Sequence, residues 1–200
     1  NGIEWLDSEF ELDAEDTFKH IVLQRNSTSI KILAEGSLVL ETTCPDLAGR
    51  RNVSIGANKA GSDTFNGYMN NLFIYKNYCK YEDNYEVPQD PDEYVPIDEE
   101  KEPEVIVTPF TTSALNFEKG LIDQIGTTIW NKEGTANVTS TNKIFGDNSF
   151  ETKALGDSLY TNSNIITGGS TPFTIEFYSL IKGRSQASGS AIPELYYPLY

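Results

Sequence analysis

The apolar residues of this chain recur with a period of two residues, and no segment has the periodicity of an amphipathic helix. In residues 18–25, apolar side chains occupy both faces, with Val22 on one face and Ile21 on the other. A strand that is apolar on both faces is expected in the centre of a sheet, because both of its surfaces must be covered. The pattern therefore predicts an all-β fold in which residues 18–25 form a central strand.

Further strands are predicted in the same part of the chain. Residues 29–33 and 37–41 flank a turn at residues 34–36, whose final glycine can adopt the positive φ that a tight hairpin needs. A short strand is expected at residues 53–56, and a longer one, rich in aromatic residues, at 65–77. The first part of the chain is thus predicted to be a run of antiparallel strands.

Residues 85–107 differ in composition from the rest of the chain. Four prolines interrupt them, and within residues 82–104 eleven acids are opposed only by Lys101. Prolines and the mutual repulsion of like charges favour an extended tether. We therefore expect a linker at residues 85–107, between a first part at 1–84 and a second part at 108–200.

A second run of strands is predicted after this linker. One strand begins at residues 114–117, and residues 172–178 alternate between apolar and polar side chains. Period two points Glu176 outward. The apolar residues on the opposite face of that strand are expected to point inward, and they are Phe173, Ile175 and Phe177.

The formal net charge of -15 argues against two classes of partner. Nucleic acids and anionic membrane surfaces both bind proteins through basic patches, whereas this chain has 15 Lys and Arg against 30 Asp and Glu. No apolar run is long enough to span a bilayer, so membrane insertion is not expected. Cys44 and Cys79 are too few for a disulfide framework, and we expect two free thiols, with a single disulfide as the alternative.

Several segments resemble the consensus of laminin-G-like domains, which belong to the concanavalin A-like jelly rolls. FKHIVLQRNSTSIKILAEGSLV at residues 18–39 and IGANKAGSDTFNGYMNNLFIY at residues 55–75 resemble the closing strands of that fold. In the second part, LNFEKG, FGDNSF, GDSLY and PFTIEFY, which start at positions 115, 145, 156 and 172, are similar to its opening strands. Where the family often carries an acid in its last strand, this chain has Asn70 and Asn71.

The resemblance implies an antiparallel jelly-roll β-sandwich, with a closing half at residues 1–84 and an opening half at residues 108–200. Modules of this kind recur in bacteriophage tail fibres, other virion proteins and bacterial surface proteins. The resemblance thus implies a non-catalytic structural and adhesion module of a virion or of an extracellular or cell surface, without a cofactor. The expected partners are other subunits of the virion or surface protein, further copies in a homo-oligomer, and a host surface glycan.

The closing half precedes the opening half, and two explanations fit this reversed order. The chain is a window on a tandem array, in which each half belongs to a different jelly roll. Alternatively, the two halves complete one permuted sandwich, with the break between Tyr200 and Asn1. A half-sandwich alone would expose its inner face and its unpaired strand edges, so neither half is expected to be stable by itself.

The alternative function is that of a retaining glycoside hydrolase. Glu11, Asp13 and Glu15 match the Glu-x-Asp-x-Glu strand motif of glucanases that share the concanavalin A-like fold. On a strand these side chains share one face, and retaining hydrolysis requires two close carboxyl groups. The motif leads directly into residues 17–20, where the laminin-G-like pattern expects a loop before a strand. We favour a chance match in an acidic stretch and predict no catalytic residue.

A calcium-dependent lectin is the third candidate, and the sequence predicts no specific metal site for it. Calcium needs several oxygen ligands, but the acids of the first segment lack the spacing of a known calcium loop. These acids are Asp7, Glu9, Asp13 and Asp16. Three acids of the second part are expected to be turn residues that bond their own backbone, namely Asp123, Asp147 and Asp157.

Two further residues carry specific expectations. His20 is the only histidine, which excludes a multi-histidine zinc site, and its place within an apolar strand favours a structural role. Trp130 is the residue that we predict to contact a ligand, because an aromatic ring can stack on the apolar face of a sugar. It lies beside Asn131 in a region flanked by glycines.

Overall fold

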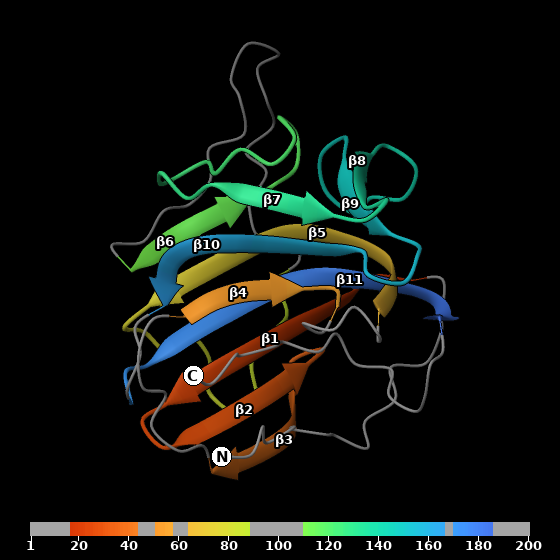
Figure 1. Cartoon of the computed structure of the whole chain (residues 1–200). Coiled ribbons are helices and arrows are strands. Elements are labelled where there is room, and N and C mark those ends of the chain that lie inside the picture. The colour runs from red at the N-terminus through yellow and green to blue at the C-terminus, as the bar shows by residue number, and fades with distance from the viewer. Residues whose placement is uncertain (1–16, 44–50, 58–63, 89–109, 167–169, 186–200) are drawn as a thin grey trace, which may run out of the picture.

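A computed structural model describes residues 17–43, 51–57, 64–88, 110–166 and 170–185 of the chain (Figure 1). These residues form eleven strands and no helix. None of them forms a helix long and apolar enough to cross a membrane. The prediction of an all-β fold is confirmed, and every strand pair in the described residues is antiparallel.

Five strands precede the acidic segment and six follow it. The first five are β1 (Lys19–Asn26), β2 (Ser29–Ala34), β3 (Ser37–Thr43), β4 (Arg51–Ile55) and β5 (Thr64–Lys76). The other six are β6 (Thr111–Leu115), β7 (Trp130–Glu133), β8 (Asn137–Thr139), β9 (Ser149–Thr152), β10 (Ser158–Ile166) and β11 (Phe173–Ser185).

The larger sheet has the strand order β3-β2-β1-β11-β5-β9-β8, and β6 also pairs with β5. β11 therefore lies between β1 and β5, and Ile175 of β11 is in register with Leu23 of β1 and Ile74 of β5. The free side of β5 is shared, because β9 pairs with its first half and β6 with its second half. β1 is central, as the two apolar faces of residues 18–25 predict.

The smaller sheet consists of β4, β10 and β7, with β10 in the middle. In Figure 1 it lies in front of the strands of the larger sheet. Apolar residues of both sheets form one core, in which Ile55 of β4 and Leu159 of β10 are grouped with Ile74 of β5. The inward-facing residues predicted for β11 belong to this core, namely Phe173, Ile175 and Phe177. Two antiparallel layers with a shared apolar interior are the arrangement of a β-sandwich.

Each sheet contains strands from both sides of the acidic segment. β11 inserts between two strands of the first part, and β10 lies between β4 of the first part and β7 of the second. The connection between β5 and β6 starts and ends at neighbouring positions, since the amide of Lys76 donates to the carbonyl oxygen of Phe110 over 2.9 Å. This is the arrangement that is required if the two parts complete one sandwich.

Residues with a positive φ form the turn between β2 and β3 and a bulge in β5. The turn between β2 and β3 consists of Glu35 and Gly36, with φ values of 49° and 78°, as a two-residue primed turn requires. The prediction of a turn here is correct, although Ala34 belongs to the strand. Asn71 of β5 also has a positive φ, of 48°, and it lies where the register between β5 and β11 shifts. Asparagine tolerates this left-handed conformation better than other residues with side chains, which suits it to a bulge.

Cleavage of the chain within residues 89–109 should leave the two parts associated, because most of the core is formed between them. A recognition site for a sequence-specific protease, placed at residues 97–102, allows the chain to be cut there. After complete cleavage, both fragments should elute together in size-exclusion chromatography at the mass of the intact chain, and the thermal midpoint should fall on dilution because unfolding now separates two fragments. Separation of the fragments without denaturant would contradict the strand order.

Candidate functional site

Residues 77–88, here called the strap, cross the face of the larger sheet that points away from the core. The strap follows β5 and is bonded to three strands or turns of that sheet in succession. The hydroxyl of Thr174 on β11 donates to the carbonyl oxygen of Tyr78 over 3.0 Å. The side-chain amide of Gln24 on β1 donates to the carbonyl oxygen of Tyr81 over 2.7 Å. Near its end, the amide of Tyr85 donates to the carbonyl oxygen of Gly36 over 3.0 Å.

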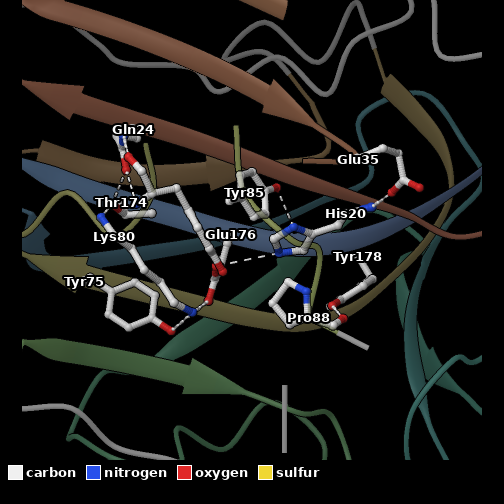
Figure 2. Close-up of polar contacts among 11 residues, drawn as sticks. His20, Gln24, Glu35, Tyr75, Lys80, Tyr85, Pro88, Thr174, Glu176 and Tyr178 are labelled. Carbon is white, nitrogen blue, oxygen red and sulfur yellow. Dashed lines mark hydrogen bonds and ion pairs between the residues drawn. The ribbon is translucent and has the colours of Figure 1, made fainter. Parts of the chain in front are cut away.

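The carboxylate of Glu176 lies beneath the strap (Figure 2). Period two correctly places this side chain on the face opposite the core. The strap covers that face here, so that only 2% of the residue is exposed. The Nζ atom of Lys80 lies 2.5 Å from Oε1 of this carboxylate, and the hydroxyl of Tyr75 donates to the same oxygen over 2.7 Å. A buried charge needs such partners to offset its desolvation.

His20 lies on the other side of this carboxylate. Its Nδ1 atom is 2.7 Å from the hydroxyl of Tyr85, and its Nε2 atom is 3.6 Å from Oε2 of Glu176. The ring also packs against Tyr178, with 4.7 Å between ring centroids. The hydroxyl of Tyr178 in turn donates to the carbonyl oxygen of Pro88 (Figure 2). His20 therefore connects β1 with the strap and with β11, so these contacts give it a structural role.

The electrostatics of this buried polar cluster favour an ionised carboxylate. Desolvation by burial raises the pKa of Glu176, but the neighbouring His20 ring and the nearby charge of Lys80 outweigh it, so that the pKa falls from 4.5 to about 2. Burial, followed by the charge of Glu176, raises the pKa of Tyr75 and of Tyr81 well above the ordinary value. The hydroxyl groups of both tyrosines therefore remain neutral at neutral pH.

The cluster holds acid and base groups but is closed in this structure. His20 and Glu176 are each 2% exposed, so a substrate could reach them only if the strap moved away. Oε2 of Glu176 and the hydroxyl of Tyr81 are buried without a hydrogen bond of good geometry. Such groups in a polar site commonly bind an ordered water. The role that this closed arrangement supports is structural: its bonds attach the strap to the larger sheet.

A second set of polar contacts fixes the loop between β8 and β9, residues 140–148. Asn70 of β5 is fully buried, and its side-chain amide donates to the carbonyl oxygens of Asn148, over 2.7 Å, and of Phe145, over 3.3 Å. The carboxylate of Glu118 accepts hydrogen bonds from the backbone amides of Asp147 and Asn148, over 2.7 and 3.0 Å. Asn70, which stands where the family pattern often has an acid, thus anchors a loop.

Trp130 lies at the start of β7 with its ring in the core, and 5% of the residue is exposed. Its indole N–H donates to the hydroxyl of Ser113 on β6 over 2.9 Å, which satisfies its polar atom within the protein. The ligand contact predicted for Trp130 remains a prediction, and this burial gives it no support.

Two of the three acids predicted to be turn residues, Asp123 and Asp157, accept hydrogen bonds from backbone amides. The carboxylate of Asp123 accepts hydrogen bonds from the backbone amides of Ile125 and Thr128, as a turn residue does. Asp157 is fully buried. Burial raises its pKa, but backbone hydrogen bonds from Ala154, Lys153 and Thr135 outweigh this effect and hold the pKa below its ordinary value. Asp147 lies in the exposed loop and pairs with Lys143 over 3.2 Å.

Other sequence predictions fall partly or wholly outside the described residues. The motif of Glu11, Asp13 and Glu15 lies there, as do the candidate calcium ligands of residues 1–16 and Cys44. Cys79, in the strap, is a free thiol whose Sγ atom lies 2.9 Å from the carbonyl oxygen of Arg25. Within the part of the chain that the structure describes, no three His, Cys, Asp or Glu side chains gather in a way that could hold a metal ion.

The sequence analysis missed the residues of the strap, because it assigned residues 85–88 to the linker. Those residues pack on the sheet instead, and residues 89–107 lie outside the described ranges. One signal was present in the sequence. Tyr78, Tyr81 and Tyr85 recur directly after β5, and three large aromatic side chains in a segment that joins strands indicate a covering rather than a free tether.

Replacement of Glu176 by glutamine should flatten the dependence of stability on pH between about 4.5 and about 2. Because the folded-state pKa is lowered, the carboxylate stabilises the fold above about pH 4.5, and this contribution is lost as the pH falls through the folded value of about 2. Its full size is on the order of 3 kcal/mol. Urea unfolding at several pH values, followed by tryptophan fluorescence, measures the slope for the wild type and for Glu176→Gln.

The matched control is Glu133→Gln, which removes an exposed carboxylate from β7. It should retain the pH slope of the wild type. Equal slopes for the wild type and Glu176→Gln would show that the buried carboxylate does not contribute as described.

Replacement of Gly36 by alanine should loosen the strap. A Cβ atom at this position would overlap the carbonyl oxygen of Tyr85, and the backbone has a φ of 78°. Gly120→Ala is the control, because φ is 81° there but the added atom would meet nothing within 4 Å. Both variants should lose roughly 1–2 kcal/mol of stability through backbone strain. Only Gly36→Ala should speed hydrogen exchange in residues 77–88; equal exchange in both variants would contradict the attachment of the strap to this turn.

Three comparisons set this chain against known proteins. No protein-family model matches the sequence, no curated protein matches it, and no solved structure matches it. The resemblance to laminin-G-like domains therefore remains a prediction that rests on the sequence motifs.

Proposed function

We propose that this protein is a non-catalytic structural and adhesion module of the laminin-G-like, concanavalin A-like jelly-roll class, of the kind found in phage tail fibres and other virion proteins. The observation that carries the proposal is that the best-positioned acid and base groups of the described residues make bonds that hold the fold together. The histidine and its buried carboxylate fix the strap, and Asp123, Asp157 and Glu118 bond backbone amides of turns.

A module of this kind would act as a rigid platform whose loops meet a partner. The loop at residues 140–148 suits this role, because Asn70 and Glu118 hold its base while Lys143, Ile144 and Asp147 are exposed at its surface. Preorganised loops bind with a smaller entropic cost than flexible ones. The proposed partner of this surface is a host surface glycan or a neighbouring subunit.

The binding test uses the labelled full chain on an array of bacterial surface glycans. Ile144→Ala shortens a side chain that is 42% exposed in this loop, and Leu155→Ala makes the same kind of change at a residue that is 57% exposed in the turn between β9 and β10. Both variants should keep the stability of the wild type within about 0.5 kcal/mol. Loss of retention is expected for Ile144→Ala only.

Two outcomes would overturn parts of this proposal. If Ile144→Ala and Leu155→Ala are retained equally, the loop at residues 140–148 is not part of the binding surface. If the wild type is retained on no glycan, the proposal of glycan adhesion is wrong. Turnover of a β-glucan that disappears in Glu11→Gln would replace the module with a retaining hydrolase.

A further inference from the structure

Five of the nine strand pairs in the described residues join one part of the chain to the other, and both parts contribute residues to the same core. β11 pairs with β1 and β5, β6 and β9 pair with β5, and β10 pairs with β4, and each of these pairs joins one part to the other. The strand pairs formed within one part are those of β1 with β2, β2 with β3, β7 with β10, and β8 with β9. Each part alone therefore presents strand edges and an apolar face that fit the other part.

One covalent connection joins these complementary surfaces. The strap packs on the larger sheet up to Pro88, and the second part begins at Phe110, so the segment between them is residues 89–109. At about 3.5 Å per residue, a segment of this length could reach roughly 70 Å. It carries eight acids, one lysine and four prolines, so its like charges repel one another. A segment of this length and composition could equally join the first part of one sandwich to the second part of another.

We propose that two copies of this chain exchange residues 110–185, so that β11 of each copy inserts between β1 and β5 of the other. The partner is a second copy of this chain, and the recognition surface is the slot between β1 and β5 together with the face of the core beneath it. Every strand pair and core contact of the single sandwich recurs in the exchanged dimer. The two forms differ only in the entropy and charge repulsion of the connecting segments.

Local concentration decides which form dominates. A connection of this length keeps the second part at an effective concentration on the order of millimolar around its own first part. Dilute chains therefore close on themselves, and chains that fold while crowded together exchange. Slow unfolding then preserves the form that was made during folding. The exchange is independent of whether the module binds a glycan.

The experiment uses the full chain with the protease site at residues 97–102. The protein is unfolded in urea and refolded at low and at high concentration, and masses are measured by light scattering after size-exclusion chromatography. The dimer fraction should rise several-fold with the refolding concentration. Cleavage of the isolated dimer should then convert it to particles of single-chain mass, each containing two associated fragments, because only the connecting segments hold an exchanged dimer together.

A second variant supplies a matched control. Leu23→Cys and Ile175→Cys place two thiols directly opposite each other on β1 and β11, in a background with Cys44→Ser and Cys79→Ser. Once oxidised in the monomer, this disulfide joins β1 to β11 of the same chain, so that refolding at high concentration should give no dimer. The same protein kept reduced should dimerise like the wild type.

Three results would overturn the proposal. The first is the absence of a dimer after refolding at any concentration. The second is a dimer that keeps its mass after complete cleavage, since this would mean association through a surface. The third is equal dimerisation of the oxidised and reduced variants.

Discussion

The insertion of β11 between β1 and β5 is the constraint on which the rest of this structure depends. It brings Leu23, Ile175 and Ile74 into register across three strands from both parts of the chain. The core beneath these strands also holds residues of the smaller sheet. In that sheet, one edge of β10 pairs with β4 of the first part. Without β11, β1 and β5 would each present an unpaired edge above an open core. The two parts of the chain therefore complete each other within one sandwich.

The buried polar cluster follows from the same insertion. β11 carries Glu176 to the middle of the outer face, where it would be an exposed acid in a bare sheet. The strap covers it and supplies Lys80, while β1 supplies His20 from the other side. A buried carboxylate is costly unless its partners are fixed, so the cluster makes the position of the strap specific as well as stable. This specificity is consistent with the proposed role as a rigid platform.

The fold class could be predicted from the sequence because it depends on local patterns. Period two in residues 18–25 and the glycine after Glu35 indicate a central strand and a hairpin turn without knowledge of distant partners. The burial of Glu176 could not be predicted in this way, since alternation assigns a side chain to a face but does not reveal what covers that face. The position of β11 depends on pairing over about 150 residues, for which no local signal exists. The partner of the Trp130 indole N–H, Ser113 on β6, is likewise not identified by alternation.

Interstrand nuclear Overhauser effects test the central claim most directly. In the intact chain, backbone protons of residues 19–26 should show cross-strand contacts with those of residues 173–179, and residues 173–185 should show a second set with residues 64–76. Both sets are predicted to come from one species, in which β11 has a neighbour on each side. Direct contacts between residues 19–26 and residues 64–76, or no contact between residues 19–26 and residues 173–179, would contradict the account.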